Sequence, residues 1–188
     1  MYLIRGINNI NLFRAKHSEV STVATIGNFD GLHLGHQQIL KTMQKEADSD
    51  GLWKLIVFTE PHAQEFFSEA AGLDASKPPR IFPWQEKVRK MKELGVELAF
   101  FLKFNNQLRS MTPVNFLDKV LLRLNIKKVI IGDDFKFGAD REGDFNLLKQ
   151  WGKENSIEVS NTETFKIEGE RVSSTRIRKA LTSGQFEL

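Results

Sequence analysis

The stretch Ile26-Gly27-Asn28-Phe29-Asp30-Gly31-Leu32-His33-Leu34-Gly35-His36 decides how the rest of the chain is interpreted. It follows a β-branched run at residues 23–26, which predicts a buried strand. Apolar residues 39, 40 and 43 then recur at helical spacing, which predicts a helix over residues 35–48. The backbone N–H groups and the positive end of a helix favour an anion at such a turn, and the three glycines let a phosphate approach the main chain. We therefore expect a phosphate-binding turn.

Two imidazoles stand at the entrance of this helix. His33 and His36 are three residues apart, so both can face the same point, and the combination suits a triphosphate. The turn has no Gly-Lys-Ser/Thr ending and lacks the glycine spacing of the dinucleotide fingerprint, which excludes two common phosphate loops. A metal-binding pair or a polar helix cap is the alternative interpretation.

Short apolar strands alternate with amphipathic helices along the rest of the chain. Strands are predicted at residues 23–26, 52–59, 96–102 and 129–131 and near 157–159 and 163–167, with an edge strand at 2–4. Helices are predicted at residues 35–48, 83–93, 112–124, 144–155 and 176–182, and residues 63–80 are expected to be a long connection. This alternation predicts an α/β domain, a doubly wound parallel sheet covered on both faces, spanning residues 1–188.

The unusual residues of the sequence all follow predicted strands. They lie at residues 27–36, 60–62, 103–105 and 132–138. Because ligands bind at the carboxyl ends of the strands in such a sheet, we expect these four loops to converge on one site.

Two further motifs carry polar side chains suited to a nucleotide. Gly132-Asp133-Asp134-Phe135-Lys136-Phe137-Gly138 predicts a loop that clasps a base or sugar, and the alternative is an acidic turn with both phenylalanines in the core. Val172-Ser173-Ser174-Thr175-Arg176-Ile177-Arg178 predicts a helix start that holds phosphates, with Arg178 adding a charge-assisted contact. The alternative there is an ordinary capped helix with a solvated basic face.

These strings resemble one known family. Gly-Asn-Phe-Asp-Gly-x-His-x-Gly-His at residues 27–36 is similar to the His-x-Gly-His signature of the nucleotidyltransferase superfamily, in the form found in the FMN adenylyltransferase module of bacterial FAD synthetases. Residues 132–138 match that family's Gly-Asp-Asp-Phe-x-Phe-Gly motif, and residues 173–178 its Ser-Ser-Thr-x-x-Arg motif. Glu60-Pro61-His62 resembles its flavin loop, although Ala63 stands where proline is usual. The resemblance extends from Val23 to Phe186.

The resemblance implies a Rossmann-like nucleotidyltransferase fold and an FMN adenylyltransferase of flavin cofactor biosynthesis, which makes FAD and pyrophosphate from FMN and Mg-ATP. The implied catalytic residues are His33, His36, Ser174, Thr175 and Arg178. The implied ATP-binding residues are Gly27, Asn28, Phe29, Asp30, His33, Gly35, His36, Gly132, Asp133, Asp134, Ser174, Thr175 and Arg178. The implied FMN-binding residues are Glu60, Pro61, His62, Phe67, Asn105, Phe135 and Phe137.

Mg²⁺ is expected to be carried mainly by the ATP phosphates, because it usually takes one or two protein carboxylates plus substrate oxygens. Asp30 is the candidate carboxylate, and a structural role in the turn is equally open. Members of the family usually continue into a C-terminal riboflavin kinase domain, which is absent from this chain. We therefore expect either a stand-alone adenylyltransferase or a fragment.

Composition restricts the protein class further. The sequence has no cysteine, which excludes disulfides and thiolate chemistry, and it has no apolar run of membrane-spanning length. A net charge of +3 is too small to indicate a nucleic-acid partner. We expect a cytoplasmic monomer or weak oligomer whose partners are ATP and FMN.

Three other functions remain open. A relative in the same superfamily could adenylylate nicotinamide mononucleotide or phosphopantetheine, or use CTP. An adenylate-forming ligase such as a tRNA synthetase shares the His-x-Gly-His motif, but the chain is short for an anticodon-reading domain. A non-catalytic protein would bind flavin or nucleotide and release no pyrophosphate.

Overall fold

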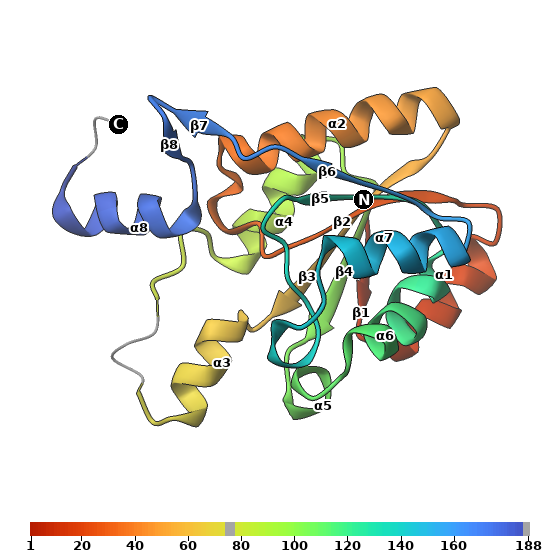
Figure 1. The fold of residues 1–188 in the computed structure, drawn as a ribbon, viewed down its shortest axis with the longest axis horizontal. Coiled ribbons are helices and arrows are strands. Elements are labelled where there is room, and N and C mark those ends of the chain that lie inside the picture. The colour runs from red at the N-terminus through yellow and green to blue at the C-terminus, as the bar shows by residue number, and fades with distance from the viewer. Residues whose placement is uncertain (74–77, 186–188) are drawn as a thin grey trace.

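A six-stranded parallel sheet organises the computed structural model, which describes residues 1–73 and 78–185 (Figure 1). The strands are β1 (Tyr2–Arg5), β2 (Thr22–Ile26), β3 (Trp53–Glu60), β4 (Leu98–Lys103), β5 (Ile126–Gly132) and β6 (Glu158–Thr162). Their order is β1-β4-β3-β2-β5-β6, and every pairing is parallel. The strand order changes direction between β2 and β5, and such a switch point opens a crevice at the carboxyl ends of the strands.

Helices cover both faces of this sheet. The first core packs α1 (Ile10–Lys16), α6 (Pro113–Phe116), the turns η4 (Leu117–Leu121) and η5 (Leu122–Leu124), and α7 (Phe145–Glu154). The second core packs α2 (Leu34–Asp50) and α4 (Trp84–Glu93). Successive side chains of a strand point to opposite faces, so Val57 of β3 enters the first core and Phe58 the second. The predicted doubly wound α/β fold is confirmed.

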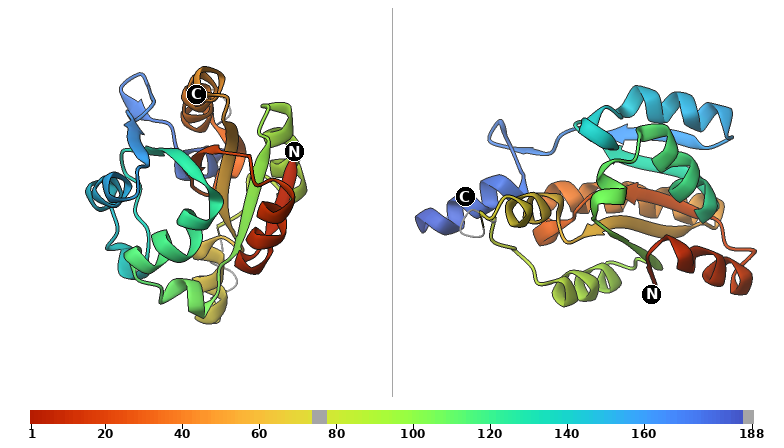
Figure 2. Two further views of the ribbon diagram at one scale, coloured as in Figure 1. Left: turned by 90° about the vertical axis from the view of Figure 1, so that its right-hand side faces the viewer. Right: turned by 90° about the horizontal axis from the view of Figure 1, so that it is seen from below.

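The remaining elements lie around the ends of the sheet. They are η1 (Ile7–Asn9), η2 (Asp30–Leu32), α3 (Ala63–Ala70), α5 (Asn106–Arg109), η6 (Ala139–Arg141), the hairpin of β7 (Lys166–Ile167) and β8 (Glu170–Arg171), and α8 (Ser174–Ser183). In Figures 1 and 2, α3 and α8 both lie at the end of the molecule where β3 ends, far from α1.

The expectation of an unstructured connection over residues 63–80 is wrong at its start, where α3 forms. His62 and Glu65 make a capping box: the His62 imidazole accepts from the backbone at the helix start, and the Glu65 carboxylate accepts from the His62 N–H. Residues 74–77 of that connection, and residue 186 where the family resemblance ends, lie outside the described residues.

Two other expectations differ from the structure. The strand expected at 163–167 is reduced to β7, because Asp133 accepts the Thr164 backbone N–H at 3.2 Å and draws that residue away from a ladder. The helix expected over 112–124 divides into α6, a π-helical turn and a 3₁₀ turn. Its start is as predicted, with Thr112 as the N-cap.

No helix within the described ranges has the length and apolar character needed to cross a membrane.

Candidate active site

The glycine-rich turn connects β2 to α2, as predicted. Phe29 (φ 51°) and Gly31 (φ 79°) both have left-handed backbone conformations, which turn the chain sharply after the strand. The Phe29 ring is only 1% exposed and packs 4.7 Å from the His36 ring, so its side chain belongs to the core beneath the turn. A Cβ on Gly35 would lie 3.3 Å from the His33 imidazole, and glycine therefore leaves room for that ring.

His33 and His36 stack with ring centroids 3.6 Å apart. Burial, followed by the charge of Arg171, lowers the pKa of His33 to about 4, and burial, followed by the nearby His33, lowers the pKa of His36 to about 3. Both rings are therefore neutral at pH 7. His33 Nδ1 accepts the His36 backbone N–H at 3.4 Å and caps α2, which assigns its ring proton to Nε2.

His36 contributes an unpaired polar atom to this turn. Its Nδ1 is buried and has no hydrogen-bond partner among the described residues. A buried polar atom without a partner is costly, and a ligand at the turn is one way to satisfy it.

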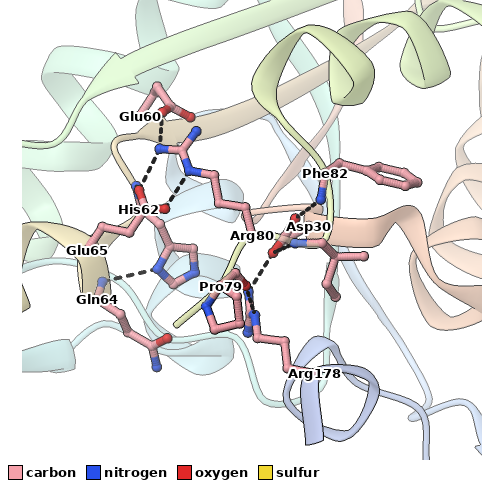
Figure 3. Close-up of polar contacts among 10 residues, drawn as sticks. Asp30, Glu60, His62, Gln64, Glu65, Pro79, Arg80, Phe82 and Arg178 are labelled. Atoms are coloured by element: carbon pink, nitrogen blue, oxygen red, sulfur yellow. Dashed lines mark hydrogen bonds and ion pairs between the residues drawn. The ribbon is translucent and has the colours of Figure 1, made fainter. Parts of the chain in front are cut away.

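Asp30 joins the turn to two distant segments (Figure 3). Its carboxylate accepts from the backbone N–H groups of Ile81 at 3.1 Å and Phe82 at 3.0 Å, and from Arg178 Nη2 at 2.6 Å. Burial raises the pKa of Asp30, but the N–H groups of Phe82 and Ile81 together with Arg178 outweigh it and lower this pKa below its ordinary value.

This arrangement does not suit Asp30 as a direct magnesium ligand, because three donors already occupy its oxygens. The described residues contain no group of three or more histidine and acidic side chains that could hold a metal ion.

Helix α8 meets the turn directly. Ser174 Oγ donates to the Asp30 carbonyl at 2.8 Å, although the two residues are 144 positions apart in sequence. Arg178 Nε donates to the Pro79 carbonyl at 2.8 Å, and Thr175 lines a surface cavity together with Arg178. The first and last motifs of the chain thus lie in contact, as the sequence predicted.

The loop after β5 faces the segment that leads to α8. The Asp133 carboxylate accepts the Thr164 hydroxyl at 2.6 Å, and Asp134 forms an ion pair with Arg171 at 2.5 Å. Gly132 ends β5 directly before these two carboxylates. Both acidic side chains therefore fasten this loop to residues 164–171.

A cavity of about 590 Å³ opens beside the turn, at the carboxyl ends of β2, β3 and β4. This volume lies in the range of cofactor-binding pockets. Its aromatic lining residues are Phe58, Phe67, Phe104, Phe116, Phe135 and Phe137. Gly27 and Asn28 of the turn line the same cavity, so the glycine-rich turn and the aromatic cavity are contiguous.

Phe67 and Phe104 of this lining form an edge-to-face pair, with ring centroids 5.8 Å apart. Phe135 and Phe137 of the same lining stack with ring centroids 5.5 Å apart. Phe137 is 7% exposed and also packs on the first core, so it is both a core residue and a lining residue. Aromatic rings that line a cavity in this way suit a flat ligand.

Four of the expected flavin-binding residues lie outside the cavity lining. Glu60 forms an ion pair with Arg80, Pro61 follows it, and His62 caps α3 by accepting the Gln64 N–H at 3.1 Å. Asn105 caps α5 by accepting the Leu108 N–H at 2.9 Å and lines a different cavity.

The sequence interpretation missed Arg80 and Phe104. Phe104 follows β4 directly, within the 103–105 loop that was expected at the site, so a signal for it existed. Arg80 lies in a connection expected to lack structure, and nothing in its sequence context distinguished it.

Comparison with known proteins identifies the family. Residues 15–176 match the family model described as FAD synthetase. This chain belongs to the FAD synthetase family. Across its whole length it is 36% identical to the bifunctional riboflavin kinase/FMN adenylyltransferase of Escherichia coli K12 and 38% identical to that of Pseudomonas fluorescens. It covers 58% and 57% of those two relatives, and thus spans less than two thirds of their length.

Solved structures agree on the fold of this FAD synthetase family member. A Streptococcus pneumoniae protein described as a macrolide-efflux protein superposes with a TM-score of 0.79 at 26% identity. The superposition covers 98% of this chain and 59% of the Streptococcus pneumoniae chain. The pantoate–β-alanine ligase of Francisella tularensis superposes with a TM-score of 0.62 at 15% identity, covering 94% and 72%. The expected Rossmann-like nucleotidyltransferase fold is confirmed.

Proposed function

We propose that this chain is an FMN adenylyltransferase, which transfers AMP from Mg-ATP to the phosphate of FMN and yields FAD and pyrophosphate. One observation carries the proposal: in a member of the FAD synthetase family, the His33–His36 turn contacts α8 and borders an aromatic cavity. This contiguity supports a phosphate site and a flat-ring site next to one another at one edge of the sheet.

The reaction needs no protein nucleophile. The second pKa of a phosphate monoester is near 6, so the FMN phosphate is already a dianion at neutral pH. One of its oxygens forms a bond to the α-phosphorus of ATP, the bond from that phosphorus to the bridging oxygen breaks, and pyrophosphate departs with the electron pair. Catalysis then depends on orientation and on stabilising the charge of the transition state.

The neutral imidazoles of His33 and His36 would donate hydrogen bonds to the phosphates, His33 through its Nε2–H. The start of α8 would offer the backbone N–H groups of Ser174 and Thr175 and the Thr175 hydroxyl to the β- and γ-phosphates, while the Ser174 hydroxyl donates to the Asp30 carbonyl and holds this helix start against the turn. Arg178 would add a fixed positive charge, which Asp30 orients. Mg²⁺ that enters with ATP would supply further positive charge for the departing pyrophosphate.

Five further expected ATP ligands lie near the carboxyl ends of β2 and β5. Gly27 and Asn28 line the cavity, and Gly132, Asp133 and Asp134 form the loop opposite them across the β2–β5 switch point. We propose that this loop encloses the base and sugar of ATP.

The lining of the cavity favours FMN over other acceptors. The rings of Phe67, Phe104, Phe135 and Phe137 in this lining suit the three fused rings of an isoalloxazine. Nicotinamide mononucleotide and phosphopantetheine carry no ring system of that size. We also propose that residues 1–188 form an adenylyltransferase domain without riboflavin kinase activity.

One assay separates the candidate functions. The chain is incubated with Mg-ATP and, in parallel, with FMN, riboflavin, nicotinamide mononucleotide or phosphopantetheine, and the products are separated by chromatography. Of the four mixtures, only the one with FMN and Mg-ATP should yield FAD. FMN produced from riboflavin would indicate a kinase activity in this domain, and FMN binding without any FAD would indicate a non-catalytic flavin protein.

A histidine variant tests the phosphate contact itself. His36→Ala should lower kcat by ~10²–10³, the usual cost of removing a donor to a developing charge. The matched control is His17→Ala, because His17 packs among Tyr2, Phe13 and Trp53, away from the site, and should keep the wild-type kcat. Wild-type turnover in His36→Ala would contradict the assignment.

A further inference from the structure

Residues 79–82, which we call the strap, are held to the phosphate side of the site by main-chain contacts. The N–H groups of Ile81 and Phe82 donate to Asp30, and the Pro79 carbonyl accepts from Arg178 Nε (Figure 3). The strap therefore fixes both the carboxylate and the guanidinium of the Asp30–Arg178 pair. Any displacement of the strap would shift Arg178 as well.

Arg80 extends from the same strap toward the flavin side. Its Nη2 contacts Glu60 Oε1 at 2.5 Å, and its Nε and Nη2 contact the two oxygens of Glu65 at 2.5 Å and 2.6 Å. The contact with Glu65 is a two-pronged arginine–carboxylate pair, which constrains orientation more than a single contact does. Figure 3 shows the guanidinium enclosed between these two carboxylates.

Glu65 connects Arg80 to the cavity through α3. Its side chain is 11% exposed, and its carboxylate also accepts the His62 N–H at 3.0 Å at the start of that helix. Burial raises the pKa of Glu65, but Arg80 and the His62 N–H outweigh it, so the pKa falls below its ordinary value. Phe67, which lines the aromatic cavity, lies on the same short helix.

A small enclosed space of about 10 Å³ lies where these contacts meet, and Arg80 lines it. Asp30, Glu60 and Glu65 face Arg80, Lys87 and Arg178 around this space. Lys87 is 6% exposed, and its ammonium lies 5.0 Å from the centre of the Phe58 ring. Carboxylates and cations are equal in number here, so loss of the Arg80 charge would leave an excess of buried negative charge.

We propose that Arg80 is a positioning residue that couples the FMN half of the site to the ATP half. The inference rests on the proposed function. Arg80 lines neither the aromatic cavity nor the one beside Thr175, so it acts through its neighbours. FMN in the cavity orders α3 and Glu65, Arg80 transmits that order to the strap, and the strap holds Arg178 in place for the phosphates. Binding of either substrate then lowers the ordering cost of the other.

The test measures coupling between ligands by calorimetry. The dissociation constant of a non-hydrolysable ATP analogue with Mg²⁺ is determined without FMN and with saturating FMN. In the wild type, saturating FMN should lower the dissociation constant of the ATP analogue by at least about fivefold, which is the lower end of the usual coupling between two ligands. The ratio of the dissociation constant without FMN to that with FMN should fall to about one in Arg80→Gln. Each ligand alone should bind Arg80→Gln with a dissociation constant within about threefold of the wild-type value.

Further variants separate coupling from folding. Arg80→Lys keeps the charge but loses the two-pronged contact, so its ratio should lie between those of the wild type and Arg80→Gln. Glu65→Gln should lower the ratio as Arg80→Gln does, and the double variant should add no further loss. The matched control is Arg89→Gln, because Arg89 also contacts two glutamates but is 57% exposed on the surface of α4. It should keep the wild-type ratio.

A wild-type ratio near one, or an undiminished ratio in Arg80→Gln, would overturn the proposal. FAD production by the wild type is measured separately. If the wild type makes FAD while Arg80→Gln keeps the full ratio, the coupling role alone fails. If the wild type makes no FAD, the proposed function fails.

Discussion

Asp30→Asn is the perturbation whose consequence follows most directly from the structure. The change preserves the shape of the side chain and removes its charge. In the wild type, the side chains of Asp30 and Arg178 are 6% and 14% exposed, so the substitution leaves an arginine largely buried without its counter-ion. It also places an amide NH₂ in a site that receives two backbone N–H groups, from Ile81 and Phe82.

The expected loss of stability is large. Removing one partner of a buried ion pair costs about 3–5 kcal/mol. With a urea m-value of about 2 kcal/mol/M, the unfolding midpoint would fall by roughly 1.5–2.5 M. The pKa of Asp30 is lowered in the folded state, so its contribution is complete above the unfolded pKa near 3.8 and is lost as pH falls through the folded value.

Urea unfolding at pH 7, followed by circular dichroism, measures this loss. Asp134→Asn is the matched control, because Asp134 also pairs with an arginine, at 2.5 Å, but the two side chains are 56% and 48% exposed. Exposed pairs contribute about 1 kcal/mol or less. If Asp30→Asn cost no more than this control, Asp30 would not be the structural link described above.

Three further outcomes are expected. As pH falls from 6.5 toward 4, the free energy of unfolding should decline by up to about 1.4 kcal/mol per pH unit for each of His33 and His36, because the pKa of each is lower in the folded state. Urea titrations at several pH values measure this slope. A free energy of unfolding that does not change with pH would contradict the conclusion that both histidines are neutral in the folded protein. Gly138→Ala should cost about 2–5 kcal/mol, because φ is +74° and a Cβ would lie 2.7 Å from the Pro113 backbone; an unchanged melting temperature would contradict that geometry. Phe67→Ala should weaken FMN binding with less effect on the ATP analogue, and equal losses in fluorescence and calorimetric titrations would argue against its place on the flavin side.

Local sequence signals were sufficient for the framework of the site. Strand-to-helix turns, helix start signals and apolar periodicity are short-range features, and they predicted the turn at residues 27–36, the helix starts near Thr112 and Asp144, and the parallel sheet. The contact of Ser174 with Asp30 could be expected only from the family resemblance, which implied that both residues bind ATP, because α8 follows the β7–β8 hairpin and not a strand of the parallel sheet.

Long-range pairing could not be predicted in the same way. Nothing in the sequence indicates that Arg80 forms ion pairs with Glu60 and Glu65. Arginines and glutamates are abundant in the chain, and which of them pair depends on the completed fold. Asp30 was the candidate magnesium ligand as the carboxylate nearest the turn, with a structural role equally open. The sequence could not decide between the two, because the backbone donors that occupy Asp30 come from residues more than fifty positions away. The same types of side chain make tertiary contacts and bind ligands, so only the structure shows which of the two a given residue does.

Radiolabel transfer tests the central claim most directly. The chain is incubated with FMN and Mg-ATP labelled in either the α- or the γ-phosphate, and the products are separated. The account predicts that the α-label is recovered in FAD and the γ-label in pyrophosphate. Recovery of the α-label in ADP and the γ-label in a flavin or inorganic phosphate would contradict it, because the bond broken would then lie between the β- and γ-phosphates.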